Sequence, residues 1–496
     1  MGHLLLSVFG FLIAVIILVT VHEFGHFIVA RAFGIRVDRF SIGFGRPLFR
    51  WYDKMGTEYV IAAIPLGGYV SLFGEKATEI TGSERYEAFC YKSVWVRISV
   101  LLAGPLFNII LAVIAFWLMF IIGITSLAPI LGHVPKGSIA DLAGLHQHQE
   151  IVSIENKPTH NWEAVSVAMV SALGKDHTVT LTVKEMNDEE NKTMETHTLD
   201  LSSLEKSGEH GDVLKDLGLV PFDPFPAVIG KVLPDTPAFK SGLKPGDRIV
   251  AVNRQPVASR MDLSEIIQAN IGKVLKFEVM REPQIQAQTQ AQSQIQQNNN
   301  RESKQALKSN KINKADKKSN TENEHLIIQI QPMAKQLEGK EVGFIGVEFV
   351  SPQKPPKEYL RTERFGVIDG FVQALKHTWE YVILTFSLLK KMIVGIISVK
   401  HLSGPIAIAN IAGHTVSIGF EYFLNFLAVI SISLGVINLL PIPLLDGGHL
   451  MFCVWELVTG RAASPQVQLL GAWLGGAFLL IITFLAIYND LVHLFM

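Results

Sequence analysis

Apolar residues gather in four long segments, and a largely polar region lies between the second and the third. The segments cover Leu4–Ala32, Ile98–Ile124, Phe423–Leu440 and Leu469–Ile487. An α-helix needs about 20 apolar residues to cross the hydrocarbon core of a bilayer. The pattern therefore predicts a polytopic α-helical membrane protein with four transmembrane helices.

A fifth apolar stretch, Tyr381–Val399, carries Lys390 and Lys391 at its middle and follows His377 and Glu380. Charges at the centre of a spanning helix are costly. We therefore expect this stretch to form an amphipathic helix that lies at the membrane interface.

The loop between the first two segments is rich in Lys and Arg, whereas Met1–His3 contains neither. Basic loops remain in the cytoplasm, so we expect the N-terminus on the outer side. Four spans then place the region of about 127–420 and the C-terminus outside as well. The first segment lacks a basic start and a small-residue cleavage site, so we expect it to remain as a span.

The 496 residues are enough for several domains, and the formal net charge of -1 gives no reason to expect a nucleic-acid partner. The chain has two cysteines, Cys90 and Cys453, which imply no disulfide framework.

The outer region contains an internal repeat. Residues 132–154 and 230–253 each read as a strand, a turn with a short helix, a Gly turn and a second strand. Both resemble PDZ domains of bacterial proteases, and the first has His148-Gln149-Glu150 where Pro-Gly-Asp is usual. A PDZ groove can add a peptide as an extra strand. Peptide binding and pure steric gating are equally compatible with the sequence.

Residues 283–323 are rich in Gln, Asn, Lys and Ser and contain no aromatic residue. Such a composition cannot bury enough surface to fold, so we expect a disordered insertion. It interrupts a predicted hairpin between Val274–Met280 and Leu326–Ile330.

The strongest chemical signal lies inside the first apolar segment, where residues 22–26 read His22-Glu23-Phe24-Gly25-His26. On a helix, H-E-x-x-H puts two imidazoles on one face, where both can bind one Zn²⁺. The adjacent glutamate can act as general base. A lone buried histidine is more often a core residue, but an unpaired carboxylate in a membrane helix needs a partner. A metal site accounts for all three residues.

A catalytic zinc usually has three protein ligands. Asp446 is the favoured third ligand, because Pro441 and Pro443 break the helix just before it and broken membrane helices line cavities. His449 is the rival ligand, and helix capping is the alternative role for Asp446.

Together these motifs resemble the site-2 protease family of intramembrane zinc metalloproteases, and within it the Gram-negative branch that regulates sigma-E and carries two tandem PDZ domains. The resemblance covers nearly the whole chain. It rests on residues 21–26, 43–48, 64–70, 402–405 and 438–446, with Leu-Asp-Gly where many relatives have Asn-Pro-Asp-Gly.

The resemblance implies that His22, His26 and Asp446 bind Zn²⁺ and that Glu23 is the catalytic base. It also implies a membrane-reentrant β-hairpin over 58–73 that accepts unwound substrate as an added strand. The implied substrate-binding residues are Asn438, Gly67, Gly68 and Tyr69.

The resemblance further implies a bacterial inner-membrane location, with both termini and the PDZ domains in the periplasm and the active site towards the cytoplasmic side. The implied substrates are single-span membrane proteins, namely an anti-sigma factor already cut on its periplasmic side and remnant signal peptides. A catalytically silent PDZ scaffold is the alternative. A transporter is a third class, but four spans without an inverted repeat do not favour it.

The expected organisation follows from these assignments. It comprises a first transmembrane helix (1–35), a cytoplasmic loop with the reentrant hairpin (36–96), a second transmembrane helix (97–126), two PDZ-like domains (127–222 and 223–350), periplasmic amphipathic helices (351–421), and third and fourth transmembrane helices (422–453 and 466–491).

Overall fold

The computed structural model of this chain describes residues 2–75, 80, 82–174, 177–186, 194–202, 204, 213–257, 259–281, 324–337, 340–350, 355–395 and 404–495. The insertion 283–323, for which we expect disorder, lies outside the described residues.

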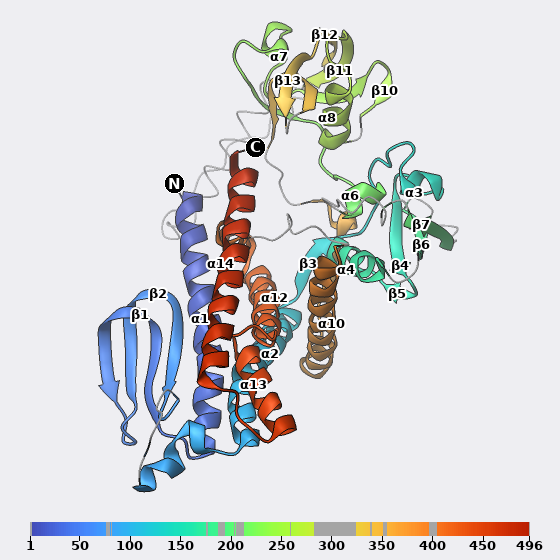
Figure 1. Cartoon of the computed structure of the whole chain (residues 1–496). Helices are drawn as coiled ribbons and strands as arrows, with labels where there is room; N and C mark the ends of the chain where they lie inside the picture. Colours follow the sequence, from blue (N-terminus) through green and yellow to red (C-terminus); the bar gives the residue numbers. More distant parts are fainter. Residues whose placement is uncertain are drawn as a thin grey trace, which may run out of the picture.

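The described residues include four helices that are long and apolar enough to cross a membrane, by length and composition. They are α1 (Gly2–Ala32), α2 (Val94–Ile122), α12 (Phe420–Asn438) and α14 (Pro465–Phe495). They confirm the four predicted spans, although the fourth helix is longer than expected. Figure 1 shows them as one bundle, with both chain termini at the end that faces two small modules.

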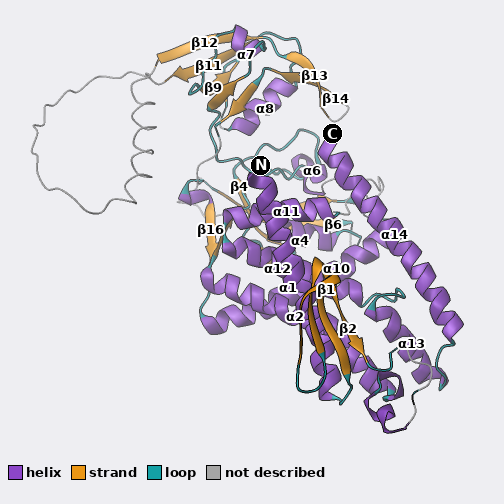
Figure 2. Cartoon of the chain, turned by 90° about the vertical axis from the view of Figure 1, so that its left-hand side faces the viewer, coloured by secondary structure: helices purple, strands orange, loops and turns teal. Residues whose placement is uncertain are grey.

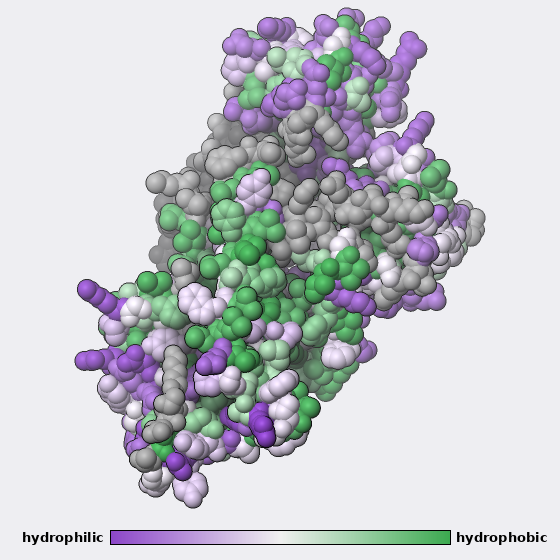
Figure 3. All heavy atoms as spheres, in the orientation of Figure 1, coloured by the Kyte–Doolittle hydropathy of each residue, from purple (hydrophilic) through white to green (hydrophobic). Residues whose placement is uncertain are grey.

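The bundle is built around α2, which packs against α1, α12, the long helix α10 (Val367–Val394) and the short helix α13 (Asp446–Thr459). Small residues let α1 and α2 approach closely, since a side chain added at Gly25 would begin 2.5 Å from the Ala103 carbonyl oxygen. A further helix, α11 (Pro405–Ile418), packs on the other half of α1. Figure 3 shows mainly apolar residues over the bundle and mainly polar residues over the module farthest from it.

A separate antiparallel sheet lies beside α1 (Figures 1 and 2), formed by β1 (Val37–Tyr52) and β2 (Glu58–Leu72). The two strands bend and pair twice, so that Ile42 lies opposite both Gly68 and Ile61, and Ile61 also lies opposite Phe49. The prediction of a hairpin confined to 58–73 is therefore wrong in extent. Residues 37–52 resemble a loop in the sequence because they are rich in basic residues. In the structure they form β1, which is the other half of the sheet. The 3-10 turns η1 (Gly82–Glu87) and η2 (Phe89–Tyr91) lead from the sheet to α2.

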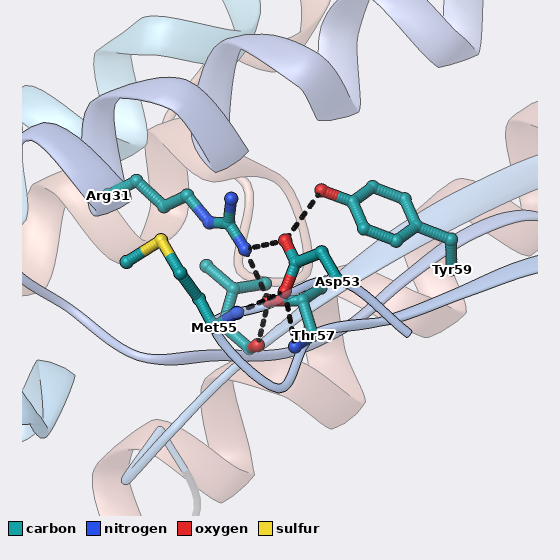
Figure 4. A network of polar contacts seen from close by, with 6 residues as sticks. Arg31, Asp53, Met55, Thr57 and Tyr59 are labelled. Atoms are coloured by element: carbon teal, nitrogen blue, oxygen red, sulfur yellow. Dashed lines mark hydrogen bonds and ion pairs between the residues drawn. The ribbon is translucent and has the colours of Figure 1, made fainter. Parts of the chain in front are cut away.

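A polar network ties this sheet to the end of α1 (Figure 4). Arg31, in the last turn of α1, pairs with Asp53 and donates to the Thr57 hydroxyl at 2.8 Å. Asp53 also accepts from the Met55 and Thr57 amides at 2.9 and 3.0 Å and from the Tyr59 hydroxyl at 3.2 Å. Desolvation raises the pKa of Asp53, but Arg31 and the two amides outweigh it and lower that pKa to about 2.

Two modules of similar build follow α2. The first contains α3 (Ile139–Leu142), β4 (Gln149–Ile154), β5 (Lys157–Pro158), α4 (Trp162–Ala172), β6 (Thr178–Glu185), β7 (Met194–Asp200) and α6 (Val213–Leu217), with strand order β5-β4-β6-β7. The second contains β8 (Ile229–Val232), α7 (Pro237–Lys240), β9 (Arg248–Val252), β10 (Gln255–Pro256), α8 (Arg260–Gln268), β11 (Leu275–Arg281), β12 (Glu324–Ile330), β13 (Met333–Leu337), β14 (Lys340–Phe344) and β15 (Val347–Phe349). Its main sheet has the matching order β10-β9-β11-β12. The matching order agrees with the predicted repeat, and the β11–β12 ladder confirms the predicted hairpin.

The turn that corresponds to Pro245-Gly246-Asp247 lies at residues 147–149 of the first module, one position before the expected 148–150. Gln149 accepts from the His146 amide at 3.0 Å, as Asp247 accepts from the Lys244 amide at 2.8 Å. His148 takes a positive φ of 72°, matching the φ of 92° at Gly246. The first module therefore has Gln147-His148-Gln149 in place of Pro-Gly-Asp. The match follows from the hydrogen bond that the third residue of each turn accepts from the backbone amide three positions before it.

Several elements fasten the first module to the bundle. β3 (Ile124–Leu127) continues α2 and pairs with β16 (Leu360–Glu363), which follows the 3-10 turn η3 (Lys357–Tyr359). Arg361 on β16 makes two hydrogen bonds to Glu150, at 2.8 and 3.3 Å. α10 (Val367–Val394) packs along α2, and its Tyr381 hydroxyl donates to Glu163 of α4. The amphipathic helix that we expect from residue 381 thus begins 14 residues earlier, at Val367, and connects the bundle to the first module. Residues 396–399, the end of the expected helix, lie outside the described residues.

Candidate metal centre

Three predicted ligands meet where α1, α2 and the start of α13 come together. His22 and His26 lie one turn apart on α1, each 8% exposed, and Asp446 is the first residue of α13. Asp446 Oδ2 lies 3.1 Å from His22 Nε2 and 3.4 Å from His26 Nε2, and the two Nε2 atoms are 3.2 Å apart. Among the described residues, only these three form a group of His, Cys, Asp or Glu side chains suited to hold a metal ion.

These separations fit a zinc ion. Ligands that sit about 2.0–2.1 Å from Zn²⁺ in a tetrahedral arrangement lie about 3.3 Å from each other. The three measured separations of 3.1, 3.2 and 3.4 Å bracket that value. In addition, the Oδ2 atom of Asp446 is buried without a well-aligned hydrogen-bond donor. A bound cation would satisfy this oxygen.

The second nitrogen of each imidazole contacts α2. His26 Nδ1 lies 2.8 Å from the Val100 carbonyl oxygen, and His22 Nδ1 lies 3.1 Å from the side-chain amide of Asn108. Both contacts are buried. Metal-binding histidines generally donate their second N–H to an acceptor, as His26 does to the Val100 carbonyl oxygen, and this fixes the ring orientation. No role for α2 was predicted, although Asn108 is a polar residue in the middle of an apolar segment and is a signal for one.

Gly104 of α2 lies directly against the two imidazoles. A Cβ atom added there would come within 2.3 Å of His26 Nε2 and 2.8 Å of His22 Cε1. Only a residue without a side chain leaves both rings in place. This requirement could not be read from the sequence, because it depends on how closely two helices cross.

A tight loop between α12 and α13 aims Asp446 at the histidines. Leu444 in this loop has a φ of 105°, a strained conformation for a residue with a branched side chain. Gly447 follows at a point where an added Cβ would lie 2.2 Å from the Leu440 carbonyl oxygen. The two prolines predict this break in the helix correctly, whereas the strain at Leu444 carries no sequence signal.

Two contacts hold the loop and α13 in place. Gly475 of α14 lies against Pro443, because a Cβ there would be 2.0 Å from the Pro443 carbonyl oxygen. At the other end of α13, Glu456 accepts a 2.7 Å hydrogen bond from Arg97 of α2. The position of Asp446 therefore depends on both α2 and α14.

Of the other two residues predicted near the metal, one borders the site and the other does not. The Asn438 side-chain amide lies 3.4 Å from His22 Nε2, so Asn438 borders the site. His449, the rival ligand, is exposed and is not part of the three-residue group.

Glu23 lies on α1 between the two histidines, and the sheet approaches it closely. A Cβ atom on Gly68 of β2 would lie 3.5 Å from Glu23 Cγ and 3.0 Å from Val19 Cγ1. Gly67 has a φ of 144° and packs on the Phe44 ring. The absence of a side chain at Gly68 therefore lets β2 pass directly beside the α1 face that carries Glu23.

Tyr69 is held within the sheet. Its ring stacks on Phe44 with ring centroids 6.2 Å apart, and its hydroxyl accepts from Arg39 at 3.0 Å. Tyr69 is thus fixed next to the two glycines, although no described contact joins it to the three metal-ligand candidates.

The chain is similar to proteins of one family along nearly its whole length. The sequence matches peptidase family M50 over residues 10–482. It is 37% identical to the regulator of sigma-E protease RseP of Escherichia coli (strain K12), over 97% of each chain. It is 36% identical to the protease RseP of Yersinia pestis, over 99% of each chain. A Vibrio cholerae relative, whose name describes a zinc metalloprotease, is 34% identical over 100% of both chains.

Proposed function

The chain belongs to peptidase family M50 and is a zinc metalloprotease of the membrane. We propose that His22, His26 and Asp446 hold the zinc ion and that Glu23 is the catalytic base. The observation that carries this proposal is the convergence of the three candidate ligand atoms at 3.1–3.4 Å.

Each residue has a defined task in peptide hydrolysis. When bound, zinc supplies Lewis-acid activation of a water and of the scissile carbonyl. Glu23 accepts the proton of the attacking water and passes it to the leaving amine. The side chains of His22 and His26 are buried and shielded by α2, which limits the access of bulk water to the site.

The proposed substrate is the transmembrane segment of a single-span membrane protein. A helix hides its amide groups in internal hydrogen bonds, so the substrate must unwind before water can attack. We infer that the sheet β1–β2 enters the membrane and accepts the unwound segment as an added strand. Gly68 lies beside Glu23, Gly67 precedes it on β2, and Asn438 borders the histidines, so these residues would orient the substrate backbone.

The natural substrates follow from the relatives by analogy. Proteins named as regulators of sigma-E suggest an anti-sigma factor already cut on its periplasmic side, and remnant signal peptides are a second class. In this proposal the protein lies in the bacterial inner membrane with both termini and both modules in the periplasm.

We propose that the two modules are PDZ domains that exclude substrates with a bulky outer domain. Their matching strand orders and the contacts that fix the first module to β16 and α10 support this role. Deletion of residues 127–350 should then permit premature cleavage of uncut substrate. A deletion variant that still ignores uncut substrate would count against the filter.

The direct test uses a tagged single-span membrane protein with a truncated outer domain, incubated with purified protein in detergent. Wild-type protein should cleave it, a zinc chelator should stop cleavage, and Glu23→Gln should bind zinc yet leave the substrate intact. Cleavage by the Glu23→Gln variant at the wild-type rate would exclude Glu23 as the base. Intact substrate with zinc-loaded wild-type protein would instead favour the silent scaffold.

A further inference from the structure

The second helix touches both histidine ligands, but in two chemically different ways. His26 Nδ1 meets the Val100 carbonyl oxygen at 2.8 Å, and a carbonyl can only accept. This contact therefore requires a proton on Nδ1 and leaves the Nε2 lone pair free for a metal. His22 Nδ1 meets the amide of Asn108, which can either donate or accept.

We propose that Asn108 is a positioning residue that selects the metal-binding form of His22 by presenting its amide oxygen to Nδ1–H. The inference rests on the proposed zinc site and goes beyond it, since it assigns a task to a residue that is not a ligand. The task is to keep the proton on Nδ1, so that Nε2 faces Asp446 as an acceptor.

The hydrogen-bond inventory around Asn108 supports this assignment. The side chain is fully buried, and its Oδ1 atom has no hydrogen-bond partner in the described structure. Its Nδ2 atom faces His22 Nδ1 at 3.1 Å. A donor at that point would force the proton onto Nε2, the nitrogen that lies 3.1 Å from Asp446 Oδ2. A half-turn of the amide exchanges Oδ1 and Nδ2 of Asn108. Oδ1 then accepts a hydrogen bond from His22 Nδ1–H, and His22 Nε2 is free to bind zinc.

The backbone of Asn108 is fixed independently of its amide. Ser431 of α12 donates to the Asn108 carbonyl oxygen at 2.8 Å, and both residues are fully buried. The side chain is thus the adjustable part of the contact. Because an amide oxygen is neutral, it orients His22 without adding charge to a site that already contains Asp446 and Glu23.

The test compares zinc affinity among variants of the full-length protein, measured by competition with a chromogenic chelator in detergent. Asn108→Leu removes the acceptor and should weaken zinc binding about 10–100-fold, the usual effect of losing a contact to a metal-binding histidine. Asn108→Ala should do the same without added bulk. Asn108→Asp keeps an oxygen at this position and should bind zinc within about threefold of wild type.

Ser431→Ala is the matched control, since it disturbs the same contact between α2 and α12 but leaves the amide in place. Its zinc affinity should equal that of wild type. The melting temperatures of the metal-free variants report whether each one folds.

The results separate this inference from the proposed function. If wild-type protein binds no zinc, the proposed site itself is wrong. If wild-type protein binds zinc and both Asn108→Leu and Asn108→Ala hold it equally well, the role of Asn108 is refuted. An Asn108→Asp variant as weak as Asn108→Leu, or a Ser431→Ala variant as weak as either, would also overturn it, because only packing would then matter.

Discussion

The link between the sheet and α1 gives a prediction whose size can be worked out from the structure. Asp53→Asn removes the charge that pairs with Arg31 and weakens the hydrogen bonds from the Met55 and Thr57 amides. The pKa of Asp53 lies at about 2 instead of its ordinary 3.8. At about 1.4 kcal/mol for each pH unit, this difference corresponds to about 2.5 kcal/mol. The Asp53 side chain is 24% exposed, so solvent screening reduces the expected loss to about 1–2 kcal/mol.

Hydrogen exchange of the amides in 53–60 measures this loss directly, because these amides exchange when the turn opens. A loss of about 1–2 kcal/mol should speed their exchange about 5–30-fold at pH 7. Asp38→Asn is the matched control on the same sheet, since the Arg36–Asp38 pair is 3.4 Å apart with side chains 36% and 47% exposed. It should change exchange by less than about twofold. Equal exchange rates in wild type and Asp53→Asn would show that Asp53 does not stabilise this turn.

The pH dependence has a definite sign. The folded state lowers the pKa of Asp53, so its contribution is complete above about pH 4 and disappears as the pH falls towards 2. The difference in exchange between wild type and Asp53→Asn, corrected for intrinsic rates, should therefore be constant from pH 7 to about 4 and shrink below it. The same loosening should raise KM for substrate more than it lowers kcat, because the sheet is proposed to bind the substrate.

Two further predictions concern close contacts around the site, and a third concerns the start of α11. Gly104→Ala should abolish stoichiometric zinc binding, because the new methyl group would lie 2.3 Å from His26 Nε2; zinc analysis of the purified variant checks this. Gly475→Ala should lower protease activity at least tenfold, because the new methyl group displaces the loop at Pro443. Gly476→Ala is the control and should remain active, because its methyl group would contact only the end of the Leu444 side chain, at 3.2 Å. Asp490→Ala should destabilise the protein by about 1–2 kcal/mol in thermal unfolding, because Asp490 accepts from three amides at the start of α11; an unchanged melting temperature would contradict this role.

The sequence was most informative where the physical cost of a residue in a membrane is high. The pair His22 and His26, with Glu23 between them, stood out because three polar groups in an apolar helix require a common partner. Asp446 could be predicted because two prolines break the preceding helix and leave a carboxylate on irregular backbone. The structure brings His22, His26 and Asp446 together as that reasoning expected.

The features that the sequence did not reveal depend on distances between elements. Gly104 and Asn108 matter only because α1 and α2 cross so closely that α2 contacts both imidazoles. The extent of the sheet was missed because its basic residues in 37–52 suggested a loop, whereas pairing with β2 outweighs that local signal. The turn at 147–149 was misaligned because the hydrogen bond that defines it is not visible in the residue types alone.

Anomalous diffraction at the zinc absorption edge, from crystals of the full-length protein, would locate the metal ion relative to His22, His26 and Asp446. We expect one zinc ion per chain, about 2.0–2.2 Å from His22 Nε2, His26 Nε2 and a carboxylate oxygen of Asp446. A zinc ion bound elsewhere, or a crystal from zinc-containing buffer with no anomalous peak between these three residues, would contradict this expectation.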